Sequence, residues 1–231
     1  MIGFYDYTVI LTYFSLLSAV TGIMVSLAGL GHPYLGCFFL LFSGLCDAFD
    51  GKVARTKANR TRREKEFGIQ IDSLSDLAAF GVLPACIGAA LLRTSPKVAM
   101  ALEGCSTAWK LYAGPIGLHA VLCLYALAAL IRLAYYNVLE QERQETENGD
   151  RASFLGLPVT SAALLFPAVM LLQYLTPTDI TLAYIGVTVV VGLLFLMPIH
   201  VRKPGWRGVL LMVAVGAVEF ALLLIWRRII R

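Results

Sequence analysis

The sequence predicts an all-α membrane protein, a bundle of six core transmembrane helices with an additional hydrophobic helix near the C-terminus. Three observations predict this class: the composition, the length of the apolar stretches and the distribution of basic residues. Hydrophobic residues make up 58% of the 231 residues, charged residues make up 15%, and the mean hydropathy is +0.75. A soluble domain carries about a quarter charged residues and does not expose this much apolar surface. The composition excludes disorder, a coiled coil and a disulfide scaffold.

The apolar stretches are long enough to cross a bilayer, because a spanning helix needs about 20 mostly apolar residues. Six stretches form the predicted core: residues 8–30, 34–54, 69–92, 113–136, 155–175 and 181–199. A crossing by a seventh stretch, residues 208–226, would place three terminal arginines outside, so we predict a hydrophobic helix there without assigning it a crossing. The chain is accordingly divided into a transmembrane domain, residues 1–200, and a C-terminal hydrophobic helix with a basic tail, residues 201–231.

The basic residues indicate how the helices are oriented. Short cytoplasmic loops carry an excess of Lys and Arg. Seven basic residues lie in the segment 52–65, at the end of the second predicted span and in the loop that follows it: Lys52, Arg55, Lys57, Arg60, Arg62, Arg63 and Lys65. We therefore expect a protein of the cell membrane, surrounded by membrane lipids, with this loop in the cytoplasm and with no nucleic-acid partner.

Four aspartates lie in two consecutive predicted spans, near the same cytoplasmic face. Asp47 and Asp50 are three residues apart, and Asp72 and Asp76 are four apart, so each pair shares one helix face. A carboxylate at the centre of a spanning helix costs at least about 2.5 kcal/mol. Carboxylate oxygens are the ligands that Mg²⁺ and Mn²⁺ prefer, and a cation would remove the repulsion among four acids. The sequence therefore predicts a site for Mg²⁺ or Mn²⁺.

Two other interpretations fit parts of this pattern. Interfacial aspartates that pair with the basic loop would suit one aspartate better than four in matched pairs. A cation transporter would need polar residues that continue across the bilayer, but beyond Asp76 the third span reads LAAFGVLPACIGAALL, which is apolar. We favour a cytoplasm-facing metal site for a phosphorylated, partly lipidic substrate. Phosphoryl-type transfer needs mainly positioning and charge neutralisation, and one carboxylate can act as the base.

Small and basic residues separate the two acidic pairs. Gly51 and Ala54 lie one turn from the aspartates, where a ligand or a neighbouring helix could come close. Arg55 and Gly68 flank the basic loop, and the forked donors of an arginine suit a diphosphate. For each glycine, helix packing is an equally good interpretation.

These residues resemble the signature of the CDP-alcohol phosphatidyltransferase family, D-x-x-D-G-x-x-A-R followed after a spacer by G-x-x-x-D-x-x-x-D. All eight positions are present: Asp47, Asp50, Gly51, Ala54, Arg55, Gly68, Asp72 and Asp76. The spacer is a few residues longer than the commonest form, which affects a loop and not the ligand spacing. Residues 71–85, 131–137 and 154–158 resemble the branch of the family that takes serine as its acceptor.

The resemblance implies transfer of the phosphatidyl group from CDP-diacylglycerol to the hydroxyl of L-serine, with release of CMP. It implies a divalent metal on Asp47, Asp50 and Asp72, with Asp76 near or on a second ion and acting as the base. It implies a nucleotide and diphosphate site made by Asp50, Gly51, Ala54, Arg55 and Gly68. It also implies a homodimer.

An acceptor pocket is expected from Arg132, Asn137 and Ser73. An arginine near the end of a span often only extends its charged head to the interface. Arg132 fits that role and fits equally a clamp for the serine carboxylate or a phosphate ligand. The acceptor itself stays open, because glycerol 3-phosphate, inositol phosphate, or serine on an archaeal ether lipid would use the same signature.

Overall fold

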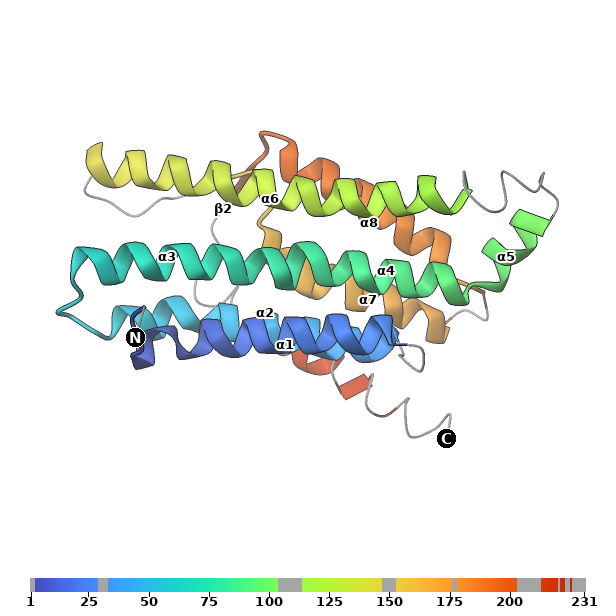
Figure 1. The fold of residues 1–231 in the computed structure, drawn as a ribbon, viewed down its shortest axis with the longest axis horizontal. Helices are drawn as coiled ribbons and strands as arrows, with labels where there is room; N and C mark the ends of the chain where they lie inside the picture. Colours follow the sequence, from blue (N-terminus) through green and yellow to red (C-terminus); the bar gives the residue numbers. More distant parts are fainter. Residues whose placement is uncertain are drawn as a thin grey trace.

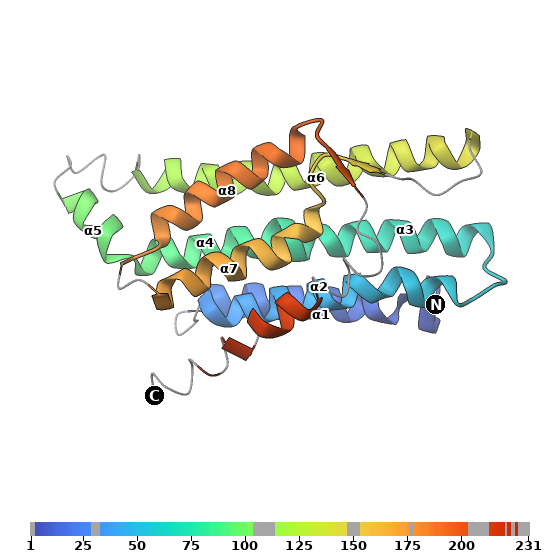
Figure 2. The same cartoon turned by 180° about the vertical axis from the view of Figure 1, so that it is seen from behind.

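The computed structural model describes residues 3–28, 33–103, 114–146, 153–175, 178–202, 213–219, 221–222 and 225. Its long helices lie side by side along the long axis of the molecule (Figures 1 and 2). The first half of the chain forms η1 (Tyr7–Val9), α1 (Ile10–Leu27), α2 (Pro33–Arg55), α3 (Arg62–Asp76), η2 (Leu77–Val82), α4 (Leu83–Thr94) and α5 (Pro96–Glu103). The second half forms α6 (Gly114–Thr146), β1 (Ser153–Leu155), η4 (Val159–Ser161), α7 (Ala162–Leu175), α8 (Thr181–Leu196) and β2 (His200–Arg202).

Among the described residues, four helices are long and apolar enough to cross a membrane: Tyr7–Leu27, Pro33–Arg55, Arg62–Thr94 and Ile116–Glu142. Two shorter apolar helices, Val159–Gln173 and Thr181–Leu196, stand where the fifth and sixth spans were predicted. The predicted class, a helical membrane bundle, agrees with this architecture. Of the predicted C-terminal helix, residues 213–219 are helical, and most of the rest lies outside the described residues.

A short two-stranded ribbon departs from the all-α expectation. β1 pairs antiparallel with β2, with Phe154 opposite Val201. The predicted fifth span begins at residue 155, but Leu155 belongs to the ribbon and the chain leaves it through Gly156, whose φ is +81°. A positive φ suits glycine because it has no Cβ.

α1 contacts α2 through a face of small and hydroxyl-bearing residues. The hydroxyl of Ser18 donates to the carbonyl of Phe39 at 2.8 Å, and the hydroxyl of Ser43 donates to the carbonyl of Ser15 at 3.0 Å. A Cβ at Gly22 would lie 2.8 Å from the Cβ of Phe39. Small residues therefore bring the two backbones close together, as is typical of helices packed in membranes.

The core of the bundle lies between α2, α4, α6, α7 and α8. Two buried tyrosines satisfy carbonyls of the η2–α4 segment. Pro84 has no N–H, so it cannot donate to the carbonyl of Phe80 four residues earlier. The hydroxyl of Tyr125 donates to that carbonyl at 2.6 Å, and the hydroxyl of Tyr184 donates to the carbonyl of Pro84 at 2.8 Å. These bonds tie α6 and α8 to the helix that carries two of the four aspartates.

Candidate active site

Three of the four aspartates converge where α2 ends beside α3. Asp47, Asp50 and Asp72 each offer one carboxylate oxygen, and these oxygens lie within 4.8 Å of one another. Asp50 is buried and the other two are half-buried. Two carboxylates come from one face of α2 and the third from the facing side of α3, as the three- and four-residue spacings predict. Oxygen ligands at this separation fit a hard divalent cation.

Asp76 lies apart from that group of three oxygens. It is the last residue of α3, one turn beyond Asp72, and only 8% of it is exposed. Its charge interacts with those of Asp47, Asp50 and Asp72. Asp76 is therefore a fourth carboxylate at the same site, set one turn beyond the three that converge.

The first helix also contributes to the site, which the sequence analysis did not predict. The hydroxyl of Thr12 donates to Oδ2 of Asp50 at 3.4 Å, and the hydroxyl of Ser75 donates to the carbonyl of Thr12 at 3.2 Å. Both bonds join α1 to the acidic face. The available signal was the recurrence of hydroxyl residues every three to four positions in an otherwise apolar span, at Thr8, Thr12, Ser15 and Ser18.

The small and basic signature residues lie around the aspartates. The guanidinium of Arg55 lies over Gly51, where a Cβ would be 3.8 and 3.9 Å from its two terminal nitrogens. Arg55 is exposed, and its charge interacts with that of Asp50. Ala54 is half-buried beside them on the last turn of α2.

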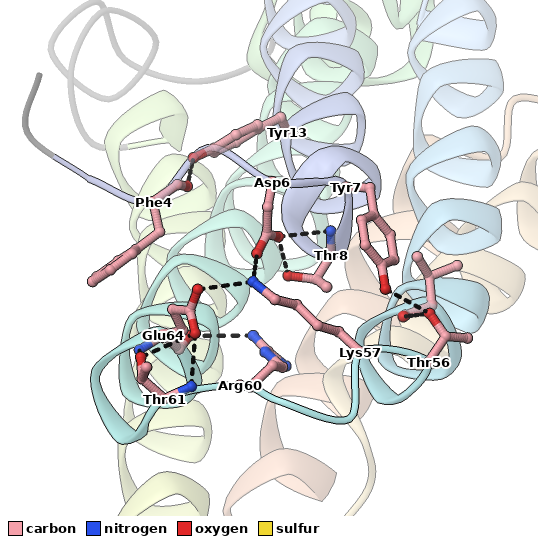
Figure 3. Close-up of polar contacts among 11 residues, drawn as sticks. Phe4, Asp6, Tyr7, Thr8, Tyr13, Thr56, Lys57, Arg60, Thr61 and Glu64 are labelled. Atoms are coloured by element: carbon pink, nitrogen blue, oxygen red, sulfur yellow. Dashed lines mark hydrogen bonds and ion pairs between the residues drawn. The ribbon is translucent and has the colours of Figure 1, made fainter.

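The loop between α2 and α3 is held by charged and capping contacts (Figure 3). Lys57 Nζ lies 2.7 Å from a carboxylate oxygen of Asp6 and 2.8 Å from one of Glu64. The ammonium group of Lys57 is the main reason that the pKa of Asp6 falls to about 2. Thr61 caps α3: its hydroxyl accepts from the backbone N–H of Glu64, and the Glu64 carboxylate accepts from that of Thr61.

On the other side of the site, two of the predicted acceptor residues contact each other. The amide nitrogen of Asn137, on α6, donates to the hydroxyl of Ser73, on α3, at 2.7 Å. Because Ser73 directly follows Asp72, this bond joins α6 to the acidic face. Ser73 in turn donates to the carbonyl of Ile69 at 3.1 Å.

Arg132 is buried, at 6% exposure, and does not extend its head to an interface. Its Nε donates to the carbonyl of Leu157 at 3.3 Å, and its guanidinium carbon lies 5.3 Å from the centre of the Tyr136 ring. A Cβ at Gly156 would lie 3.0 Å from the same Nε. The turn at 156–158 therefore closes against Arg132, one and a half turns before Asn137 on α6.

A family model covers nearly the whole of this architecture. The model for CDP-alcohol phosphatidyltransferases matches residues 8–215, which include the four long helices, both shorter ones and every aspartate of the site. The chain belongs to the CDP-alcohol phosphatidyltransferase family.

Individual relatives carry a more specific name, CDP-diacylglycerol–serine O-phosphatidyltransferase. The protein of that name from Helicobacter pylori is 30% identical over 178 residues, 76% of this chain and 62% of that protein. The one from Saccharomyces cerevisiae is 31% identical over 163 residues, 69% of this chain and 50% of that protein. The one from Methanocaldococcus jannaschii is 29% identical over 154 residues, 66% of this chain and 56% of that protein. The chain thus spans about half to three fifths of the length of these relatives.

Proposed function

We propose that this protein is a membrane CDP-diacylglycerol–serine O-phosphatidyltransferase, which moves the phosphatidyl group to L-serine and releases CMP. One observation supports this most directly: Asp47, Asp50 and Asp72 occupy signature positions of the family and bring their oxygens within 4.8 Å of one another. The names of the relatives supply the serine acceptor and the CDP-diacylglycerol donor.

The donor set fits Mg²⁺ or Mn²⁺, since three carboxylates from two rigid helices supply hard oxygen ligands. A divalent ion bound by Asp47, Asp50 and Asp72 would neutralise the diphosphate oxygens and the charge that develops on the leaving CMP. On the nucleotide side, Gly51 and Ala54 leave room for the cytidine against α2, and the cationic guanidinium of Arg55 faces the diphosphate together with the backbone at Gly68.

Asp76 is the proposed general base. Its carboxylate accepts the proton of the serine hydroxyl, and the serine oxygen attacks the phosphorus that carries the diacylglycerol. The bond from that phosphorus to the bridging oxygen of the diphosphate breaks, and its electron pair leaves with CMP. The burial of Asp76 one turn beyond Asp72 supports this role, because it places a carboxylate beside the convergent oxygens without including it among them.

We propose that α7 and α8 complete six crossings. α8 has 16 residues, about 24 Å, which is less than the roughly 30 Å hydrocarbon core. α7 and α8 form a helical hairpin. At one end of this hairpin the backbone N–H of Gly156 donates to the carbonyl of Ile199 at 2.6 Å. At the other end Asp179 accepts from the hydroxyl of Ser95, at the end of α4. The hairpin therefore runs from the ribbon to the end of α4 that lies opposite the aspartates (Figure 2).

The same proposal places the site on the cytoplasmic side of the cell membrane, because the basic α2–α3 loop adjoins the aspartates. It keeps residues 1–200 as the catalytic domain and residues 201–231 as a hydrophobic helix with a basic tail. The family resemblance favours a homodimer. Light scattering of the purified protein in detergent, which measures its molar mass, tests this.

The deciding experiment supplies the purified chain, in mixed micelles, with CDP-diacylglycerol, Mn²⁺ or Mg²⁺, and one alcohol at a time. Release of CMP should require L-serine and a divalent cation and should stop with EDTA. Parallel reactions with glycerol 3-phosphate, inositol phosphate or an ether-lipid donor test the alternatives. CMP release that ignores serine and follows another alcohol would refute the serine acceptor. Ion flux into liposomes without CMP formation would favour a transporter.

A further inference from the structure

The cations of the α2–α3 loop are not equivalent. Lys57 is neutralised between Asp6 and Glu64 (Figure 3). Arg60 forms no ion pair with a carboxylate in the part of the chain that the structure describes. Its Nη2 donates to the backbone carbonyl of Glu64 at 3.2 Å, and its buried Nε has no hydrogen-bond partner among the described residues. Arg60 therefore has no carboxylate as an ion-pair partner among the described residues, although its side chain is held in place.

Arg60 lies in the space that Gly68 leaves open. A Cβ at Gly68 would be 2.7 Å from Nη2 of Arg60 and 3.8 Å from its guanidinium carbon. Gly68, Asp72 and Asp76 are spaced by four residues and share one face of α3. Gly68 precedes Asp72 by one turn, about 6 Å along the helix axis. The guanidinium thus lies on the face of the acidic site, one turn toward the cytoplasmic end.

Contacts of the N-terminal segment help to hold the loop around Arg60. The Phe4 ring packs edge-on against Phe67, the neighbour of Gly68, with ring centres 5.5 Å apart. The hydroxyl groups of Thr56 and Tyr7 form a hydrogen bond, with their oxygens 3.3 Å apart. With the cap at Thr61, these contacts hold both ends of the loop. An arginine held in this way loses little freedom when it binds an anion.

We propose that Arg60 is a phosphate-binding residue for a cytidine diphosphate ester and that the signature glycine Gly68 forms its seat. The proposal rests on the proposed function, since it assumes a diphosphate on the aspartate-bound cation. Arg55 lies at the end of α2, over Gly51, and Arg60 comes from the α2–α3 loop and lies over Gly68 on α3. The two forked donors would hold the diphosphate from two sides, with hydrogen bonds to its non-bridging oxygens.

Binding of CDP in the presence of Mn²⁺, measured by titration calorimetry on the full chain in detergent, tests this directly. Arg60→Ala should weaken CDP binding about tenfold or more, because hydrogen bonds to charged groups are among the stronger ones. Arg60→Lys keeps the charge but loses the forked donors, so its affinity for CDP should lie between those of the wild type and Arg60→Ala. Arg63→Ala is the matched control: it removes the same charge from an exposed position on the first turn of α3 and should change binding less than twofold. The KM for CDP-diacylglycerol should follow the same order, with the KM for serine unchanged.

Gly68→Ala tests the seat. The added Cβ should displace the guanidinium and weaken CDP binding about as much as Arg60→Ala does, and it should add little in a chain that already carries Arg60→Ala. Equal CDP binding by folded Arg60→Ala and Arg63→Ala proteins would overturn the phosphate role. If Gly68→Ala weakens CDP binding just as much in a chain that already carries Arg60→Ala, Gly68 does not act by seating Arg60. If Arg60→Ala does not fold, Arg60→Lys and Gly68→Ala decide. A wild-type protein that binds CDP but releases no CMP with any alcohol would overturn the proposed function alone.

Discussion

The amide of Asn137 and the hydroxyl of Ser73 form a 2.7 Å hydrogen bond that joins α6 to α3 directly beside Asp72. Ser73 donates its own proton to the carbonyl of Ile69, so its hydroxyl both donates and accepts. We therefore propose that Ser73 positions Asn137 and that the Asn137 side chain contacts the acceptor alcohol directly.

We predict that Asn137→Ala raises the KM for L-serine about tenfold and leaves the KM for CDP-diacylglycerol within twofold. Ser73→Ala should raise the KM for serine less, about fivefold, because it removes one hydrogen bond that contributes about 1 kcal/mol. Steady-state kinetics of CMP release measure both. Gln70→Ala, an exposed polar residue on the same helix, is the control. A larger effect on the KM for the nucleotide lipid would place Asn137 in the donor site instead.

The aspartates should separate into two functional kinds. Asp47 belongs to the group of oxygens within 4.8 Å, and Asp76 does not. Asp47→Asn should therefore weaken Mn²⁺ binding, seen by titration or electron paramagnetic resonance, and reduce turnover with it. Asp76→Asn should abolish turnover while Mn²⁺ and CDP still bind. Glu66→Gln, which changes an exposed acid, should alter neither. Retained turnover in Asp76→Asn would exclude it as the base.

The features that follow from local periodicity could be predicted from the sequence. The predicted second span, residues 34–54, agrees with α2 (Pro33–Arg55) within one residue at each end. The approach of Asp47 and Asp50 to Asp72 follows from helical spacing on two neighbouring spans. The third predicted span starts at residue 69, but the helix itself begins at Arg62. Hydropathy does not detect the first turns because they are polar. The Thr61–Glu64 capping box was the signal for that boundary.

The features that depend on distant partners could not be predicted. The ribbon pairs Phe154 with Val201, and the sequence of neither segment indicates which segment it pairs with. The bond from Thr12 to Asp50 joins residues 38 apart. That Arg132 is buried, and does not extend to the interface, depends on the turn at Gly156 that closes over it.

Gly156 should be a sensitive position for stability. Its φ of +81° would cost an alanine about 1–2 kcal/mol. The new Cβ would also lie 3.0 Å from Nε of Arg132 and 3.2 Å from the carbonyl of Met197. Gly156→Ala should therefore lower the Tm in detergent by several degrees and reduce activity through Arg132. Gly186→Ala, on α8, is the control, because a Cβ there meets no atom of the described residues within 4 Å and alanine is the better helix former. Equal losses of Tm would contradict this account.

The contact between Asp6 and Lys57 should make the α2–α3 loop sensitive to acid. The Lys57 ammonium, followed by Thr8, lowers the pKa of Asp6 from 3.8 to about 2. A lowered folded-state pKa stabilises the protein fully above the unfolded value, and this stabilisation is lost as the pH falls from about 4 toward 2. Asp6→Asn should expose the amides of residues 56–61 to faster hydrogen exchange at pH 7. Its difference from wild type should persist down to about pH 4 and disappear near pH 2. Glu66→Gln, which breaks the exposed pair with Arg62, should leave exchange in the loop unchanged. If the difference is already absent at pH 5, Lys57 does not keep Asp6 ionised. The contact between them then does not hold the loop that carries Arg60.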